Sequence, residues 1–229
     1  MKITIICPIY HPDITVLNNL KNRLNKQNFD GLSIQKIFID GTGGLARTYN
    51  SGISKSKGEI IITLHQDCVP KEKKFIKKLI EPFKEKKVVM VTAKIRDFET
   101  KKDYFSFPPD GKATAYRKKI LKKVGFFDDK TFFTGGEDVD IYLKMKKFGR
   151  IINVNTVVEH VHGGYLGNKT FEKRKQNGNI NGCLFKKWGV KNPFWWKAII
   201  MCFLYPFSYG KQFLHAFKIG KQDYMRKNE

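Results

Sequence analysis

EIIITLHQDC, residues 59–68, joins a run of apolar residues to a cluster of polar ones. A short apolar run of this kind predicts a buried strand. Asp67 comes just past its end, where a carboxylate at the edge of a sheet can hold a metal ion. Further along, GGEDVD at residues 135–140 opens a helical pattern, and a carboxylate pair at a helix start can supply a general base. Together the two motifs suggest a metal-assisted group transfer.

Apolar runs and helical patterns alternate along the chain on both sides of this stretch. The predicted strands cover residues 2–7, 34–39, 59–64, 88–93 and 151–161, and the predicted helices cover residues 13–26, 45–57, 71–87, 118–124 and 137–148. Pro82 is expected to kink or end the helix over 71–87. The alternation predicts an α/β fold, with a mostly parallel sheet and helices on its faces. The pattern weakens over residues 97–116.

Length and composition place the chain among ordinary globular proteins. Its 229 residues suit one large domain, or one domain with an appendage, and 41% of them are hydrophobic. The four cysteines are scattered and none has the spacing of a metal site, which favours reduced thiols in the cytosol. The residues after Met1 already have a strand pattern, so no signal peptide is expected.

The formal net charge of +23 fits three classes of partner: nucleic acid, an anionic membrane surface, or phosphorylated substrates. Lysine on every solvated face is the alternative explanation. The lysines recur on the polar sides of amphipathic patterns and are not gathered in one arm. The hypothesis that the chain is a non-enzymatic, basic nucleic-acid-binding protein therefore rests on charge alone, because no recognised nucleic-acid motif is present.

Three predicted strands end in residues that suit a nucleotide. The first is followed by Pro8 and Tyr10, the second by Asp40, and the third by His65, Gln66 and Asp67. Ligands of parallel sheets bind outside the carboxyl ends of the strands, which favours a nucleotide crevice. The glycine turn at residues 41–44 has neither the Walker nor the dinucleotide spacing. Arg47 in the next helix is a candidate for a diphosphate contact.

A metal ion at Asp67 would need few protein ligands, because phosphate oxygens and water supply the rest. One carboxylate and one imidazole suffice for manganese. The candidate imidazoles are His160 and His162, two residues apart at the end of the strand predicted over 151–161, and an extended chain places them on the same side. We expect one of the two to be the ligand.

These pieces, in this order, resemble the family-2 glycosyltransferases, which have the GT-A fold. The segments that carry the resemblance are IICPIY at 5–10, GLARTYNSGI at 44–53 with KGE at 57–59, HQD at 65–67, GFFD at 125–128, GEDVD at 136–140 and VEH at 158–160. They span roughly residues 1–165. His65 stands where the family's Asp-x-Asp motif has its first aspartate, and the segment after Asp40 is short. Within the family the chain resembles envelope-glycan rhamnosyl- or galactosyltransferase-like members from bacteria and archaea.

The resemblance implies inverting transfer of a sugar from a nucleotide-diphosphate donor to a hydroxyl of a glycan or lipid-linked acceptor. Asp138 is then the general base, and Glu137 positions the acceptor or Asp138. The implied metal is Mn²⁺ or Mg²⁺, held by Asp67 with His160 or His162. The implied donor-binding residues are Pro8, Tyr10, Asp40, Arg47, Asn50, His65, Gln66 and Asp67.

The implied catalytic domain covers residues 1–165, with a donor half over 1–95 and an acceptor half over 96–165. Another enzyme class with a related sheet, the sugar-phosphate nucleotidyltransferases, would need a glycine-rich phosphate loop after the first strand. Pro8-Ile9-Tyr10-His11 stands in that place.

Residues 166–229 form a basic, aromatic and helical segment by their pattern. The apolar run over 198–207 is shorter than the roughly 20 residues needed to cross a bilayer. Trp195, Trp196 and Lys197, followed by Lys211, Lys218 and Lys221 beside Phe213, Leu214 and Phe217, indicate an amphipathic segment at an anionic membrane surface. The expected location is cytoplasmic, peripheral on the inner face of the cell membrane. The alternative is a helix packed on the catalytic domain or on a dimer partner.

Overall fold

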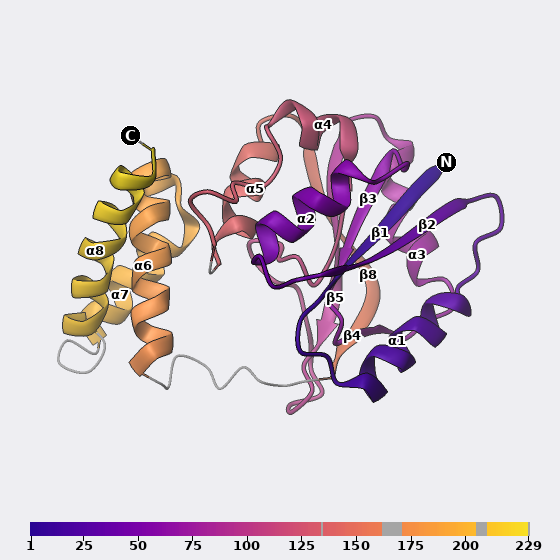
Figure 1. Cartoon of the computed structure of the whole chain (residues 1–229), viewed down its shortest axis with the longest axis horizontal. Helices are drawn as coiled ribbons and strands as arrows, with labels where there is room; N and C mark the ends of the chain where they lie inside the picture. Colours follow the sequence, from indigo (N-terminus) through magenta and orange to yellow (C-terminus); the bar gives the residue numbers. More distant parts are fainter. Residues whose placement is uncertain (134, 162–170, 205–209, 229) are drawn as a thin grey trace.

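The computed structural model describes residues 1–133, 135–161, 171–204 and 210–228. Its chain forms an α/β unit built on one sheet and, beside it, a unit of three helices, α6, α7 and α8 (Figure 1). The N-terminus lies in the α/β unit and the C-terminus in the helical unit. None of the described helices is both long and apolar enough to cross a bilayer.

The sheet is mixed, whereas the sequence pattern predicts a mostly parallel one. Its order is β2-β1-β3-β7-β5-β8-β4, with β6 paired to β5. The strands are β1 Lys2–Ile9, β2 Ser33–Asp40, β3 Ile60–Leu64, β4 Cys68–Pro70, β5 Val88–Arg96, β6 Asp103–Tyr104, β7 Ala113–Arg117 and β8 Arg150–His160. β1 runs parallel to β2 and β3, and β5 runs parallel to β8. β7 lies antiparallel between β3 and β5, inside the stretch where the sequence pattern is weak.

Helices cover both faces of the sheet. They are α1 Ile14–Asn25, α2 Leu45–Ser54, α3 Phe75–Ile80, α4 Lys118–Lys123 and α5 Glu137–Met145. Asp13 caps α1, because its Oδ1 accepts hydrogen bonds from the backbone N of Thr15 and Val16. The helix predicted over 71–87 is shorter: α3 gives way at Glu81 to a 3-10 turn, η1 Glu81–Lys84, which contains Pro82.

Two apolar layers enclose the sheet, and alternate residues of its central strands feed opposite layers. Ile60 and Ile62 of β3 pack in the layer that includes α1 and α3. Ile61 packs in the other layer, with α2, α5 and part of α6. Every residue of β3 is buried, which explains the unbroken apolar run in its sequence.

The C-terminal third is helical, as its pattern predicts. It contains α6 Phe171–Trp188, a 3-10 turn η3 Gly189–Lys191, α7 Pro193–Leu204 and α8 Lys211–Asn228. α6 and α8 lie side by side with little space between their backbones (Figure 1). A Cβ atom placed on Gly178 would lie 2.6 Å from Cβ of Ala216, and one on Gly182 would lie 3.0 Å from Cα of Gly220. The glycines therefore allow the two helices to touch backbone to backbone.

Candidate active site

Two adjoining cavities lie at the carboxyl ends of β1, β2 and β3. The first has a volume of about 410 Å³. Its lining includes Pro8, Tyr10, Thr42, His65, Gln66 and Asp67, and also Gly135 just before α5. The second, of about 500 Å³, is lined by Tyr10, Phe38, Asp40 and Thr42 among others. Tyr10 and Thr42 belong to both linings, so the two cavities adjoin, and we call them together the crevice.

Gln66, in the loop after β3, is hydrogen-bonded to Tyr10 in the loop after β1. The backbone N of Tyr10 donates to Oε1 of Gln66 at 2.9 Å, and Nε2 of Gln66 donates to the carbonyl of Tyr10 at 2.7 Å. Asp40 organises the glycine turn in a similar way, because its carboxylate accepts from the backbone N and the hydroxyl of Thr42. The structure thus brings Pro8, Tyr10, Asp40 and Gln66 to one crevice.

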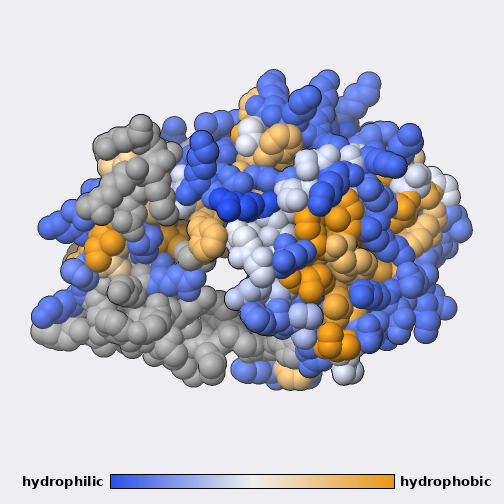
Figure 2. Space-filling view, viewed as in Figure 1, coloured by the Kyte–Doolittle hydropathy of each residue, from blue (hydrophilic) through white to orange (hydrophobic). Residues whose placement is uncertain are grey.

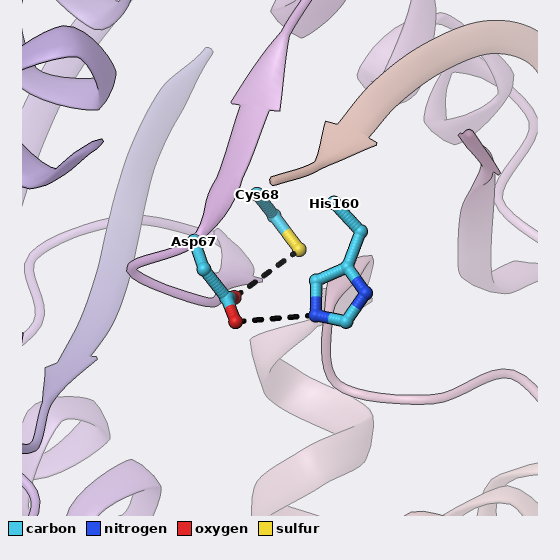
Figure 3. Close-up of side chains that lie close together, drawn as sticks. All are labelled: Asp67, Cys68 and His160. Atoms are coloured by element: carbon cyan, nitrogen blue, oxygen red, sulfur yellow. Dashed lines mark hydrogen bonds and ion pairs between the residues drawn. The ribbon is translucent and has the colours of Figure 1, made fainter. Parts of the chain in front are cut away.

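Asp67 and His160 form the centre of a group able to hold a metal ion. Nε2 of His160 is hydrogen-bonded to Oδ2 of Asp67 at 3.1 Å, and the thiol of Cys68 donates to Oδ1 of Asp67 at 3.7 Å (Figure 3). The three ligand atoms lie within 4.8 Å of one another. β4 pairs antiparallel with β8 so that Cys68 is opposite His160, which brings the histidine to the carboxylate. His162 lies outside the described residues.

The protonation states favour a carboxylate–imidazole pair. Burial raises the pKa of Asp67, but the hydrogen bond from His160 and its charge outweigh this, and the pKa falls below its usual value. Burial raises the pKa of the Cys68 thiol well above its usual value. Asp67 is therefore ionised at neutral pH while Cys68 keeps its proton. One carboxylate oxygen and one imidazole nitrogen could hold Mn²⁺, which accepts an imidazole ligand more readily than Mg²⁺ does.

His65, in the place of the first aspartate of Asp-x-Asp, faces a different partner. Its Nε2 lies 3.0 Å from the hydroxyl of Tyr49, and it is not part of the metal-binding group among the described residues. Burial and the nearby Lys112 ammonium lower the pKa of His65 to about 4, so it is neutral at physiological pH. His65 lines the first cavity as a neutral hydrogen-bonding group.

The acidic motif stands at the start of α5. Gly136, the residue before the helix, has a φ of 95°, a left-handed conformation that favours glycine. Glu137 is buried and Asp138 half-buried, and Oδ1 of Asp138 accepts from the backbone N of Val139 at 2.8 Å. No described residue forms a hydrogen bond with Oε2 of Glu137. Burial raises the pKa of both carboxyl groups, helped by the charge of Asp138 for Glu137 and by that of Asp110 for Asp138.

The acidic motif and the crevice are joined through the loop before α5. Phe133 and Gly135 of this loop line the first cavity. A Cβ on Gly44, in the glycine turn, would lie 2.8 Å from the carbonyl oxygen of Phe133, so the loop and the turn pack directly together. Glu137 and Asp138 are not part of the cavity lining, but Gly135, two residues before Glu137, lines the same cavity as Asp67.

Two residues from the donor set have other surroundings. Asn50 uses both ends of its amide on Phe127: Nδ2 donates to the carbonyl at 2.9 Å, and Oδ1 accepts from the backbone N at 3.1 Å. This holds the turn that follows α4. Arg47 is exposed on α2, with its Cδ close to Gly43. Neither side chain is part of the lining of the two cavities.

The sequence pattern did not predict an ion pair formed by two residues that lie, along the chain, between the HQD motif at 65–67 and the GEDVD motif at 136–140. Nζ of Lys112 donates to Oδ2 of Asp110 at 2.7 Å, and both side chains are largely buried. The backbone N of His65 donates to the carbonyl of Lys112, which places the pair at the end of β3. Burial raises the pKa of Asp110, but Lys112 outweighs it and lowers the pKa, so both partners stay charged. The only signal in the sequence was the DGK triplet before a strand that it did not predict.

A second missed feature lies on the far side of α5. Asp140 is fully buried and is paired with Lys144 and Lys187, each at 2.8 Å. Lys187 also reaches Asp128 at 2.7 Å. In addition, Ile180 of α6 packs on Gly135 and Gly136 so closely that a Cβ on either would lie under 3.0 Å from it. α6 thus supports the helix start that carries Glu137 and Asp138.

Comparisons with known proteins bear on the family and on the fold. Residues 24–134 match the model of the family described as Glycosyl transferase family 2, in line with the resemblance stated above. No curated protein sequence matches the chain.

Three solved structures have a similar fold. A mannosyltransferase from Pyrobaculum calidifontis in complex with GDP-Man and Mn²⁺ has a TM-score of 0.62 at 12% identity, over 98% of this chain and 75% of that one. The catalytic domain of Drosophila beta1,4galactosyltransferase 7 in complex with xylobiose has a TM-score of 0.55 at 12% identity, over 76% and 78%. GalNAc-T7 with UDP, GalNAc and Mn²⁺ has a TM-score of 0.57 at 13% identity, over 82% and 51%. These likenesses confirm the predicted GT-A fold.

Proposed function

We propose that this chain is an inverting glycosyltransferase that moves a sugar from a nucleoside-diphosphate donor to a hydroxyl of a glycan or lipid-linked acceptor. One observation carries the proposal. Asp67, which is hydrogen-bonded to His160, and the loop leading to Glu137 and Asp138 line one cavity, in a chain with the GT-A fold. The match of residues 24–134 to Glycosyl transferase family 2 supports the same reaction class.

The donor fits the two adjoining cavities. The cavity between the ends of β1 and β2 takes the nucleoside, with the Asp40 carboxylate available to accept from base or ribose donors. The diphosphate and sugar then occupy the first cavity, beside Asp67. Each cavity has the size of an ordinary ligand site. Two of the similar structures are complexes with GDP-Man and with UDP, nucleotides with different bases, so the base is left open here.

Asp67 and His160 would hold the divalent metal. When bound, the ion neutralises negative charge on the departing diphosphate. The ionised state of Asp67 and the short distance to His160 suit this role. Cys68, buried and protonated, contributes a soft sulfur that such a hard ion does not favour.

Asp138 is the proposed general base. Its carboxylate takes the proton of the acceptor hydroxyl as that oxygen bonds to the anomeric carbon. The bond from this carbon to the diphosphate oxygen breaks, and the electron pair leaves with the nucleoside diphosphate. Attack from the face opposite the leaving group inverts the anomeric centre. The raised pKa of Asp138 makes it a stronger base than an ordinary aspartate.

Glu137 is proposed to position the acceptor. Its Oε2 is buried and has no hydrogen-bond partner among the described residues, so it is available to a hydroxyl of the incoming sugar. By resemblance we propose rhamnose or galactose as the transferred sugar and an envelope polysaccharide as the product.

A ligand panel tests the proposal. Thermal-shift and calorimetric titrations with uridine, guanosine and thymidine diphosphates and their sugars, with and without Mn²⁺, identify the donor. We expect one base to be preferred and its affinity to depend on the metal. The anomeric configuration of the product then reports inversion. If no nucleoside diphosphate binds under either condition, the proposal fails.

A further inference from the structure

One face of α7 exposes large apolar side chains to solvent. Trp196, Ile200, Phe203 and Leu204 have exposed fractions of 58%, 56%, 81% and 64%. Their spacing of four, seven and eight residues places them on one side of a helix. We call these four residues the apolar stripe. Figure 2 shows apolar side chains at the surface of the helical unit, at the left of the view.

The other aromatic residues of this unit form its core. The ring of Trp195 stacks on Phe185 at 4.1 Å and lies 4.9 Å from Phe217. Phe213 and Phe217 are buried. The expectation that Trp195, Phe213 and Phe217 face a membrane is therefore wrong. The apolar stripe is not needed for this core, and contiguous exposed apolar residues mark an interaction surface.

The segment of the chain that contains the stripe is strongly basic, although Lys187 is paired with Asp128 and Asp140. Residues 186–221 contain seven lysines and no acidic residue. Lys186, Lys191, Lys211 and Lys218 are exposed. A second copy of the chain would bring two such regions together, and their like charges would repel. An anionic lipid surface has the complementary charge and attracts each lysine that lies near it.

The length of α7 decides how it could meet the bilayer. Its 12 residues extend about 18 Å, whereas the hydrocarbon core is about 30 Å thick. α7 is apolar on most sides and contains one lysine, Lys197. It is thus too short to span the bilayer but apolar enough to lie in the plane of the interface.

We propose that α7 binds an anionic membrane surface, with the apolar stripe in the acyl–headgroup boundary and the exposed lysines of residues 186–221 at the lipid headgroups. This binding does not depend on the proposed transfer reaction. It would place the crevice near acceptors that carry a lipid.

Flotation of the full chain with vesicles tests the proposal. The vesicles are phosphatidylcholine alone, or phosphatidylcholine with a quarter of phosphatidylglycerol. We expect the chain to float with the anionic vesicles and at least about tenfold less with the neutral ones. Phe203→Ser removes an exposed ring and should weaken partitioning about tenfold. Phe107→Ser is the matched control, because Phe107 is 67% exposed on the α/β unit, and it should partition as the unchanged chain does.

A second readout locates the contact. Trp196 is the exposed tryptophan of α7, while Trp195 is stacked in the core, so brominated anionic lipids should quench Trp196 emission. The proposal is overturned if the unchanged chain stays with the neutral fraction, or if Phe203→Ser floats equally well. It is also overturned if sedimentation without lipid shows a dimer that Phe203→Ser converts to a monomer. That result would assign the stripe to a second copy.

Discussion

Nε1 of Trp188 donates a 2.9 Å hydrogen bond to Oδ1 of Asp140, which joins the end of α6 to the helix that begins with Glu137 and Asp138. Asp140 is fully buried, and a buried carboxylate is stable only when it is paired. Two of its partners, Lys187 and Trp188, come from the C-terminal third. The proposed base therefore depends on contacts that lie far from it in sequence.

Lys187→Met should lower the free energy of unfolding by about 3 kcal/mol, because it leaves Asp140 and Asp128 short of a charged partner. Urea unfolding measures the change. Lys186→Met is the matched control, since Lys186 is exposed, and should shift the midpoint little. Equal midpoints for the two variants would show that Lys187 does not support α5.

Asp138→Asn should reduce turnover at least about 100-fold, because an amide cannot accept the acceptor proton. Donor affinity should stay the same, since Asp138 belongs to the acceptor motif. A coupled assay for released nucleoside diphosphate and a donor titration measure the two effects. Asp30→Asn, at an exposed carboxylate, is the control. Full turnover in Asp138→Asn would remove the residue from the base role.

The pH dependence of turnover should show an acid limb above the usual range of a carboxyl group. Burial and the charge of Asp110 raise the pKa of Asp138, and the base is active only when ionised. Turnover therefore falls as the pH drops through this raised pKa. Asp110→Asn removes the negative charge and leaves the Lys112 cation, and both changes lower the pKa of Asp138. The acid limb of kcat/KM should move to lower pH, and an unmoved limb would refute this coupling.

Metal dependence should rest on Asp67 and His160. Asp67→Asn or His160→Ala should weaken Mn²⁺-dependent donor binding by roughly 10- to 100-fold or more, as the loss of groups around a metal commonly does. Cys68→Ser should leave it unchanged, because the thiol stays protonated. Calorimetry with and without Mn²⁺ makes the comparison. Strong loss in Cys68→Ser would instead show that sulfur is a ligand.

The sequence predicted those parts of the molecule that have a local pattern. The buried strands show as apolar runs, α1 shows its stripe and its cap at Asp13, and the crevice residues follow strand ends. β4 has only three residues, and β7, with the sequence ATAYR, lacks the unbroken apolar run that marks β3, so neither strand shows a local pattern.

The missing parts of the site are long-range contacts. The Asp110–Lys112 pair was missed because its place beside His65 depends on β7. The contact of Asn50 with Phe127 spans 77 positions, and no spacing rule connects them. The pairing of α6 with α8 also decides which aromatic residues near the C-terminus are buried and which are exposed. The composition of the segment does not reveal this pairing.

The close contact of α6 with α8 limits which sequences can form this helical unit. Gly178, Gly182 and Gly220 each face main-chain or Cβ atoms of the other helix, so even a methyl group at these positions forces the helices apart. Exposed lysines of the same helices, such as Lys186 and Lys218, do not face the other helix closely and can be replaced by side chains of other sizes. In a saturation mutagenesis experiment, these three glycines should reject nearly every replacement, while Lys218 between them on the chain accepts most. The positions that reject substitution would then mark where α6 and α8 touch.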